Sequence, residues 1–299
     1  MIGGSSKAEG NVIYGDFGGY GAIPRELQVN QMDYLIQNNI FYANRNEERP
    51  GISGNVGNMN GVGFSVDANL NHTGGLNISI LDNVFGVGFN LHGFDNADIL
   101  IQRNSFGISK NLQHQLPFFT QALSLRSITG KALIGGTSTA EGNNFTNTNS
   151  HLPYQKLFPG AVWIEQSSQI ELSHNSFFCN PEMPLLYTQT GPFATATPKP
   201  IEALLDNVTS NSVSGRSKPG ARIELFYSDP ECTNCQPKRY FATVKADANG
   251  NWIDIDGNHQ AIPVALIPEK INAYVTANYP NQYVTSIDNE TTYTEVELS

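Results

Sequence analysis

Hydrophobic and polar residues alternate along several short stretches in the first two thirds of the chain, and these stretches end in the same way. Two apolar residues at period two are followed by an asparagine and, two positions later, by a phenylalanine. The copies are Tyr34, Ile36, Asn39 and Phe41; Ile78, Ile80, Asn83 and Phe85; Ile99, Ile101, Asn104 and Phe106; and Ile170, Leu172, Asn175 and Phe177. Period two places both apolar side chains on one face of a short strand, and the asparagine suits a bend where its amide bonds to a backbone group. The recurrence predicts a unit that stacks on copies of itself.

A second family of alternating strands precedes most of these copies. Its second and fourth positions are apolar and face inward, whereas its third and fifth positions face outward. The members are Glu26–Asn30, Gly63–Asp67, Gly88–His92, Ala122–Arg126 and Ala161–Glu165. Because they begin at uneven intervals, we expect the polar inserts 44–60, 111–120 and 147–160 to leave the stack as loops.

A longer repeat relates residues 2–13 to residues 134–145, and both copies begin with Ile-Gly-Gly. The glycines allow tight corners with positive φ. The first copy opens at the second residue of the chain, and a stack of coils needs a cap at each end. We therefore expect the natural protein to extend further upstream.

These coil motifs resemble the right-handed parallel β-helix of the pectate-lyase-like superfamily. The Ile-Gly-Gly pattern is especially similar to β-helices in large bacterial surface proteins. The resemblance covers residues 1–191 and implies a solenoid in an extracellular or cell-surface protein. It implies little about activity, because one fold hosts many unrelated functions.

The remainder of the chain has a different pattern. Residues 192–200 contain Pro198 and Pro200 and predict a stiff linker. Short alternating strands over 221–227, 241–245 and 271–276, with a turn of the Asn-Gly hairpin kind at 247–251, predict an all-β sandwich over 201–299. Trp252 is expected in its core.

The run from Val213 to Trp252 resembles bacterial Ig-like modules. Such modules occur in multidomain surface proteins of Bacteroidota, often upstream of a type IX secretion sorting domain. No sorting domain follows here, so the C-terminus is also expected to be truncated.

The composition of the chain disfavours some classes of binding partner. The chain has 17 basic and 27 acidic residues, with a formal net charge of −10, which argues against nucleic acid because phosphates need concentrated positive charge. It has no apolar run long enough for a membrane span, and no signal-peptide pattern follows Met1. Polysaccharide or a surface glycan is the partner class that the β-helix resemblance implies; the oligomeric state is not predicted.

Outward positions of the second strand family carry the candidate chemistry. The fifth position gives a row of titratable groups, and the third gives polar and aromatic groups beside it. The rows are Asp67, His92, Arg126 and Glu165, and Asn90, Ser124 and Trp163.

Three interpretations of these rows stay open. Asp67 would orient His92 as a general base, while Arg126 would bind a uronate carboxylate, as in a polysaccharide lyase. Alternatively, Trp163, Asn90 and Ser124 contact sugar without catalysis. The third interpretation is a solvated row of ion pairs that contributes little energy. Asp67 and Glu165 are three coils apart, roughly 14 Å by strand spacing, which is too far for an inverting hydrolase.

Known enzyme signatures are largely missing. The His92-Gly93 pair is the only fragment of a polygalacturonase-like pattern, since no Arg-x-Lys run occurs. No cofactor is implied, and the histidines lack metal-ligand spacing. Asp95 and Asp98 beside Asn96 would form at most a weak calcium site in a loop.

Three cysteines complete the inventory. Cys232 and Cys235 form a Cys-x-x-Cys, and Cys179 stands alone. No helical pattern follows the pair as redox catalysis would require, and zinc would need two further ligands. A Cys232–Cys235 disulfide, or a pair of thiols, that holds a loop is the expectation.

The sequence therefore favours a non-enzymatic segment of a secreted or cell-surface bacterial protein. Its expected role is that of a structural stalk or adhesion module that contacts glycans. The alternative is a polysaccharide lyase or glycoside hydrolase that acts on the parallel-sheet face.

Overall fold

The computed structural model describes residues 2–13, 20–22, 31–48, 64–67, 75–94, 96–117, 121–148, 160–181, 183–188, 201–209, 212–228, 236–256, 262, 264, 267–289 and 294–298. The chain forms two compact units. Met1–Lys199 and Tyr227–Tyr240 belong to the first, and Pro200–Phe226 and Phe241–Ser299 belong to the second. The sequence analysis placed residues 201–299 in the second domain, whereas the described residues 227–228 and 236–240 group with the first unit.

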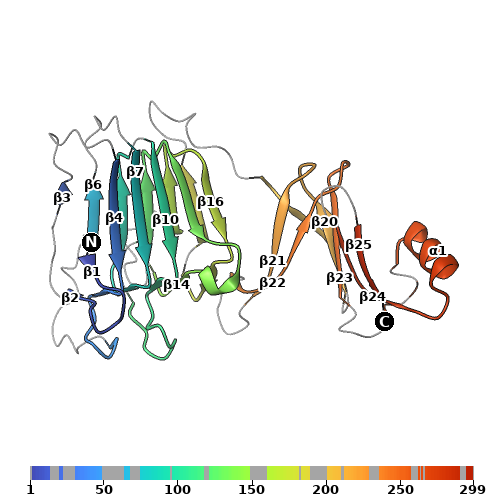
Figure 1. Ribbon diagram of the computed structural model, residues 1–299, viewed down its shortest axis with the longest axis horizontal. Coiled ribbons are helices and arrows are strands. Elements are labelled where there is room, and N and C mark those ends of the chain that lie inside the picture. The colour runs from blue at the N-terminus through green and yellow to red at the C-terminus, as the bar shows by residue number, and fades with distance from the viewer. Residues whose placement is uncertain are drawn as a thin grey trace. The chain divides into compact units, whose positions relative to one another are not determined.

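The first unit is built from three six-stranded parallel sheets, which the chain visits in turn (Figure 1). Sheet A contains β1 (Ile2–Gly3), β4 (Gln31–Gln37), β7 (Gly75–Leu81), β10 (Ala97–Gln102), β13 (Lys131–Gly135) and β16 (Ile170–Ser173). Sheet B contains β2 (Val12–Ile13), β5 (Ile40–Phe41), β8 (Val84–Phe85), β11 (Ser105–Phe106), β14 (Asn144–Thr146) and β17 (Ser176–Phe178). Sheet C contains β3 (Tyr20–Ala22), β6 (Phe64–Asp67), β9 (Phe89–His92), β12 (Leu123–Arg126), β15 (Gly160–Glu165) and β18 (Met183–Thr188).

The repeated phenylalanines form one continuous stack inside this unit. Each ring lies nearly parallel to the next, with centroid separations of 4.6–4.9 Å. The stack runs through Phe41, Phe85, Phe106, Phe145 and Phe177. The isoleucines of sheet A pack against it in the same hydrophobic core. The inward positions of the predicted strands are therefore confirmed.

The repeated asparagines form a second continuous row at the bend between sheets A and B. In each rung, the backbone N–H and the side-chain amide of one asparagine donate to the Oδ1 of the next, at 2.9–3.1 Å. The row runs through Asn39, Asn83, Asn104, Asn143 and Asn175, all buried. Each Nδ2 also donates to a carbonyl of the preceding coil, as from Asn104 to Ile80. Bonding to the backbone was expected, but bonding between the asparagines of successive coils was not.

The two copies of the Ile-Gly-Gly repeat form matching turns. Glu9 accepts from Ser5 and Ser6, and Glu141 accepts from Thr137 and Ser138. The glycine after each glutamate approaches a backbone carbonyl of the next coil, and a Cβ built on Gly142 would lie 2.0 Å from the His174 oxygen. This close approach explains why both copies of the repeat have glycine after the glutamate.

Sheet C confirms the predicted strands from Gly63 onward. The first member of that family is different: β3 (Tyr20–Ala22) pairs with β6, whereas the predicted strand Glu26–Asn30 lies outside the described residues. The inserts 44–60, 111–120 and 147–160 are described only in part.

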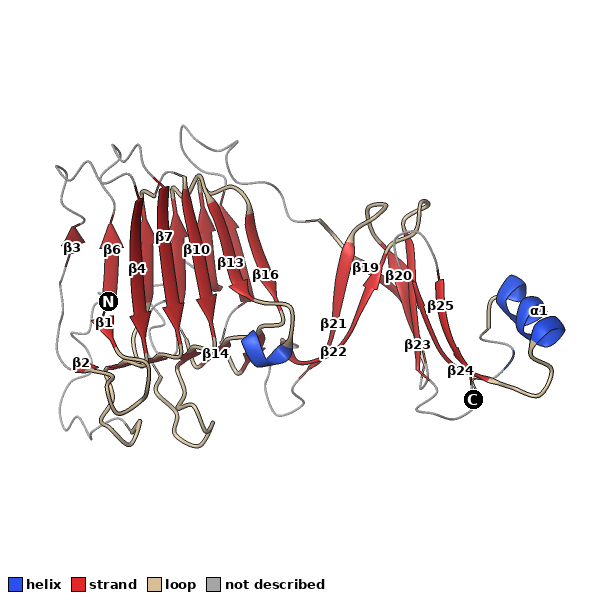
Figure 2. Ribbon diagram, viewed as in Figure 1, coloured by secondary structure: helices blue, strands red, loops and turns tan. Residues whose placement is uncertain are grey.

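The second unit contains antiparallel sheets and one helix (Figure 2). A five-stranded sheet runs β19 (Leu204–Val208), β20 (Ser212–Arg216), β23 (Asn251–Asp256), β24 (Val284–Asn289) and β25 (Thr294–Leu298). The second sheet has two strands, β21 (Arg222–Ser228) and β22 (Pro237–Lys245), of which residues 227–228 and 237–240 group with the first unit. Trp252 is 3% exposed in a cluster with residues of β21 and β22, as expected of a core residue.

One strand prediction in this unit is wrong. Residues 271–276 belong to helix α1 (Glu269–Asn278). Ile271 and Val275 are four residues apart and pack into one cluster with Val284 and Ile287, which is the spacing of one helix face. The turn at 247–251 does form, with the Asp247 carboxylate accepting from Asn249 and Asn251. It joins the two sheets rather than neighbouring strands of one sheet.

Candidate functional site

The four titratable candidates lie side by side on sheet C. The register pairs Asp67 with His92, His92 with Arg126, and Arg126 with Glu165. The third-position residues follow the same order, with Asn90 beside Ser124 and Ser124 beside Trp163. The alignment of outward positions is therefore reproduced, although the side chain of Asp67 is not among those described.

Arg126 is engaged within this face. Its Nε lies 2.7 Å from a carboxylate oxygen of Glu165, and its guanidinium carbon lies 4.8 Å from the centre of the Trp163 ring. The Glu165 side chain is 12% exposed. A lyase needs an arginine that is free to meet a substrate carboxylate or developing negative charge, and here that charge is already paired.

Trp163 is not an open platform for sugar. It is 6% exposed, and its indole N–H donates to the Thr188 hydroxyl at 2.9 Å. Ser124 beside it is 1% exposed. Among the residues proposed for sugar contact, only Asn90 is half-exposed, and His92 is exposed next to it. The sequence pattern predicted outward positions correctly but could not show that two of them are covered.

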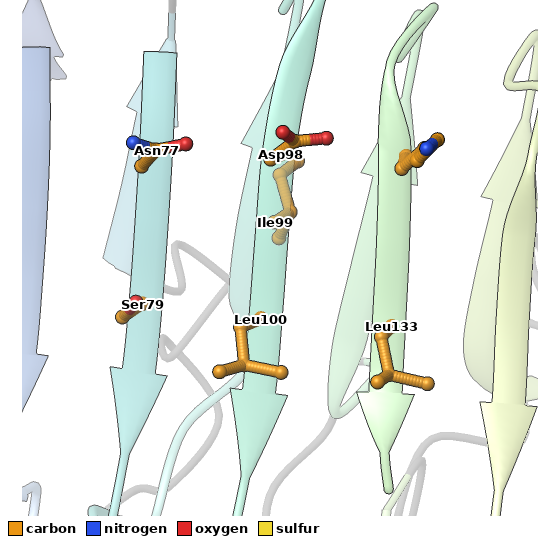
Figure 3. A pocket seen from close by; sticks show the side chains of 7 residues that line it. Asn77, Ser79, Asp98, Ile99, Leu100 and Leu133 are labelled. Atoms are coloured by element: carbon orange, nitrogen blue, oxygen red, sulfur yellow. The ribbon is translucent and has the colours of Figure 1, made fainter.

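A groove lies on a different face of the first unit, across the outer side of sheet A. It encloses 330 Å³ and is lined by Asn77, Ser79, Asp98, Ile99, Leu100, Lys131 and Leu133. Figure 3 shows Asn77 and Asp98 at one level of neighbouring strands, and Ser79, Leu100 and Leu133 at the next level. The register places Lys131 beside Asp98. A polar row thus runs parallel to a largely apolar row.

The sequence analysis missed this groove. Apart from Ile99, its residues are outward positions that alternate with buried ones along the strands of sheet A, as Leu100 does with Ile99 and Ile101. The first motif is defined by its inward residues. The same alternation also predicts that the residues between them face outward.

A cluster of charges holds the corner after β7 and β10. Arg103 donates to both carboxylate oxygens of Asp82 at 3.0–3.2 Å, and Lys110 lies 3.5 Å from the same carboxylate. Partial burial alone would raise the pKa of Asp82, but the hydrogen bonds from Arg103 and the charges of Lys110 and Arg103 outweigh it. The pKa of Asp82 is therefore lowered.

This pKa predicts how Asp82 contributes to stability. A carboxyl group whose pKa is lower in the folded than in the unfolded protein stabilises the fold above its unfolded pKa, and this contribution disappears as pH falls through the folded pKa. We expect Asp82→Asn to cost under about 1 kcal/mol at pH 7, because the pair is partly solvated. Urea unfolding measures the stability of the unsubstituted chain and of Asp82→Asn at a series of pH values. The two stabilities should converge below about pH 4, the ordinary range of an aspartate pKa. A cost that persists undiminished at low pH would contradict this assignment.

The end of the stack is bonded to a segment from later in the chain. Asn180 and Gln236 exchange side-chain and backbone hydrogen bonds at 2.7–3.2 Å, and Ser176 donates to the Lys238 carbonyl. Cys179 is disulfide-bonded. The chain has two other cysteines, Cys232 and Cys235, both outside the described residues. The predicted Cys232–Cys235 disulfide falls on those two cysteines, and the bond at Cys179 is one that the sequence analysis did not predict.

One thiol per chain is therefore expected. Titration of the denatured, unreduced protein should release one equivalent, and reduction should release two more. In Cys179→Ser, the unreduced protein should show either two thiols or none, depending on whether the remaining cysteines pair. Three titratable thiols in the unreduced native chain would contradict the assignment.

Neither a metal-binding group of side chains nor a membrane-spanning helix occurs among the described residues. They contain no group of three or more His, Cys, Asp or Glu side chains placed to share a metal ion. Asp95 of the predicted calcium site lies outside them, so that prediction stays open. No helix among them is both long and apolar enough to cross a bilayer.

Comparison with protein families gives a match to the last part of the chain, most of which belongs to the second unit. Residues 231–299 match a family model described as "Putative beta-lactamase-inhibitor-like, PepSY-like". The matched segment contains β22, β23, α1, β24 and β25 and leaves residues 1–230 unmatched. No curated protein and no solved structure matches the chain.

Proposed function

We propose that the first unit is a right-handed parallel β-helix that serves as a non-enzymatic stalk or adhesion scaffold. Support comes from strands that pair with every third strand along the chain, and from asparagine and phenylalanine rows that tie each coil to the next. A scaffold of this kind transmits load along the stack, because each coil contacts only its neighbours.

The observation that carries this proposal is the pairing of Arg126. Its charge is neutralised by Glu165 and its planar face rests on Trp163. The arginine that a lyase would direct at a uronate carboxylate is thereby paired with a carboxylate of its own sheet. A disulfide at Cys179 supports a secreted or cell-surface location, since such bonds persist in oxidising compartments.

Glycan contact is proposed at the groove on sheet A rather than on sheet C. Asn77, Asp98 and Lys131 offer an amide, a carboxylate and an ammonium group for sugar hydroxyls. Leu100 and Leu133 offer an apolar surface beside them. These groups recur at the strand spacing of about 4.8 Å, which suits an extended polymer that crosses the strands.

An activity assay tests the non-enzymatic part of this proposal. The purified chain is incubated with a panel of uronate-containing and neutral polysaccharides, and unsaturated and reducing ends are measured. We expect no release above that of heat-treated protein. Turnover that disappears in His92→Ala or Arg126→Ala would overturn the proposal in favour of a polysaccharide lyase or glycoside hydrolase.

A glycan array tests the binding site. Binding is expected to fall at least tenfold in Asp98→Asn and Leu100→Ser. It should be unchanged in Glu171→Gln, a matched exposed position on β16 of the same sheet. Loss in Arg126→Ala with retention in Asp98→Asn would move the contact to sheet C, and an array without hits would contradict glycan contact.

A further inference from the structure

The five-stranded sheet of the second unit ends at β25. Among the described strands, β25 pairs only with β24, so its other edge carries no described strand from Glu295 to Glu297. An edge of this kind is a template for another strand.

A cavity lies beside this edge, under helix α1. It encloses 400 Å³ and is lined by Lys270, Ile271, Tyr274, Val275 and Tyr279 of the helix side and by Thr294, Val296 and Leu298 of β25. The two tyrosines are 62% and 42% exposed, whereas Val296 and Leu298 pack on the core of the unit. Side chains of α1 thus extend over the cavity next to β25. The side chains of a strand added at that edge would fit into this cavity.

The opposite face of β25 is acidic. Glu295 and Glu297 alternate with the cavity-lining residues and are exposed, and no described cation pairs with either of them. A strand added to β25 would place every second residue beside this negative charge.

We propose that the β25 edge binds an extended segment of another protein, in which apolar residues alternate with lysine or arginine. The apolar residues would enter the cavity under α1, and the basic residues would lie beside Glu295 and Glu297. Main-chain hydrogen bonds to the edge would supply affinity, and the two faces would supply specificity.

A second copy of this chain is a poorer occupant of the same edge. Pairing β25 with itself would bring the glutamates of both copies onto one face, and like charges opposite one another destabilise a sheet. The net charge of −10 opposes such association as well. Basic segments gain from the same charges.

The test uses the full chain and a fluorescein-labelled peptide of alternating valine and lysine, monitored by anisotropy. We expect saturable binding that weakens as salt is raised. Tyr274→Ala and Glu297→Gln should each weaken it at least fivefold, whereas the matched surface variants Tyr283→Ala and Glu269→Gln should leave it unchanged. Circular dichroism of each variant excludes unfolding as the cause.

Two control peptides separate strand addition from charge attraction. One has the same composition with valines and lysines in separate blocks, and the other carries N-methyl groups on alternate residues, which remove backbone donors. Both should bind at least tenfold more weakly. Equal binding of either control, no binding of the alternating peptide, or a concentration-dependent dimer in sedimentation that Glu297→Gln strengthens would overturn the proposal.

Discussion

Asn104→Ala is expected to destabilise the first unit by about 4 kcal/mol, because it leaves several buried groups without partners. Asn104 is fully buried in the middle of the row. Its side chain donates to the carbonyls of Ile80 and Gln102 and to Asn143 Oδ1. Its own Oδ1 accepts from the backbone and side chain of Asn83. Alanine removes all of these bonds and cannot admit enough water to replace them.

Urea unfolding measures this cost. The chain has two tryptophans, with Trp163 in the first unit and Trp252 in the second. In a Trp252→Phe background, fluorescence therefore reports the first unit alone. The midpoint should fall while the slope m stays constant, as for a change in stability without a change in exposed surface.

Asn11→Ala is the matched control at the end of the row. Asn11 is exposed, and its amide makes one hydrogen bond, to Asn39 Oδ1 at 3.0 Å. Its loss should cost under about 1.5 kcal/mol. Equal costs at the two positions would mean that the row does not act as a buried network.

The sequence predicts the repeating part of this fold well because local and global signals agree there. Ile99, Ile101 and Phe106 occupy the positions that the alternation assigns to the core. The bonding of Asn104 to Asn143 follows from stacking, so it required the register, which the unequal insert lengths concealed. The bond from Asn180 to Gln236 spans 56 residues and has no signal in either segment.

The candidate sites show where sequence reasoning ends. The alternation placed Arg126 and Trp163 on an outward face, and the register agrees. Whether such a face is open depends on tertiary packing, and Trp163 is nearly covered. In the second unit, Ile271 and Tyr274 resemble strand residues by composition. The packing of Ile271 and Val275 against Val284 and Ile287 selected the helix, as tertiary contacts often override local propensity.

Phe106→Ala is the second substitution expected to destabilise the first unit strongly, because it interrupts the continuous aromatic stack. The ring of Phe106 is fully buried, 4.6 Å from Phe85 and 4.9 Å from Phe145. Removal of a buried phenylalanine ring costs about 3–5 kcal/mol through lost burial and the cavity left behind. Met183→Ala, at a side chain of the first unit that is 46% exposed, serves as the surface control and should cost under about 1 kcal/mol.

A double-mutant cycle tests whether the rings act together. Phe85→Ala and Phe106→Ala remove neighbouring rings and enlarge one cavity, so their costs should fail to add by at least about 0.5 kcal/mol. Phe41 and Phe145 are separated from each other by Phe85 and Phe106 in the stack, and their substitutions should add within about 0.5 kcal/mol. Urea midpoints of the four single and two double variants, read from Trp163 as for Asn104→Ala, decide between these outcomes. Additivity for the neighbouring pair would mean that each coil holds its ring independently. The stacked rings would then not couple the coils, and the scaffold proposed for this unit would rest on the asparagine row alone.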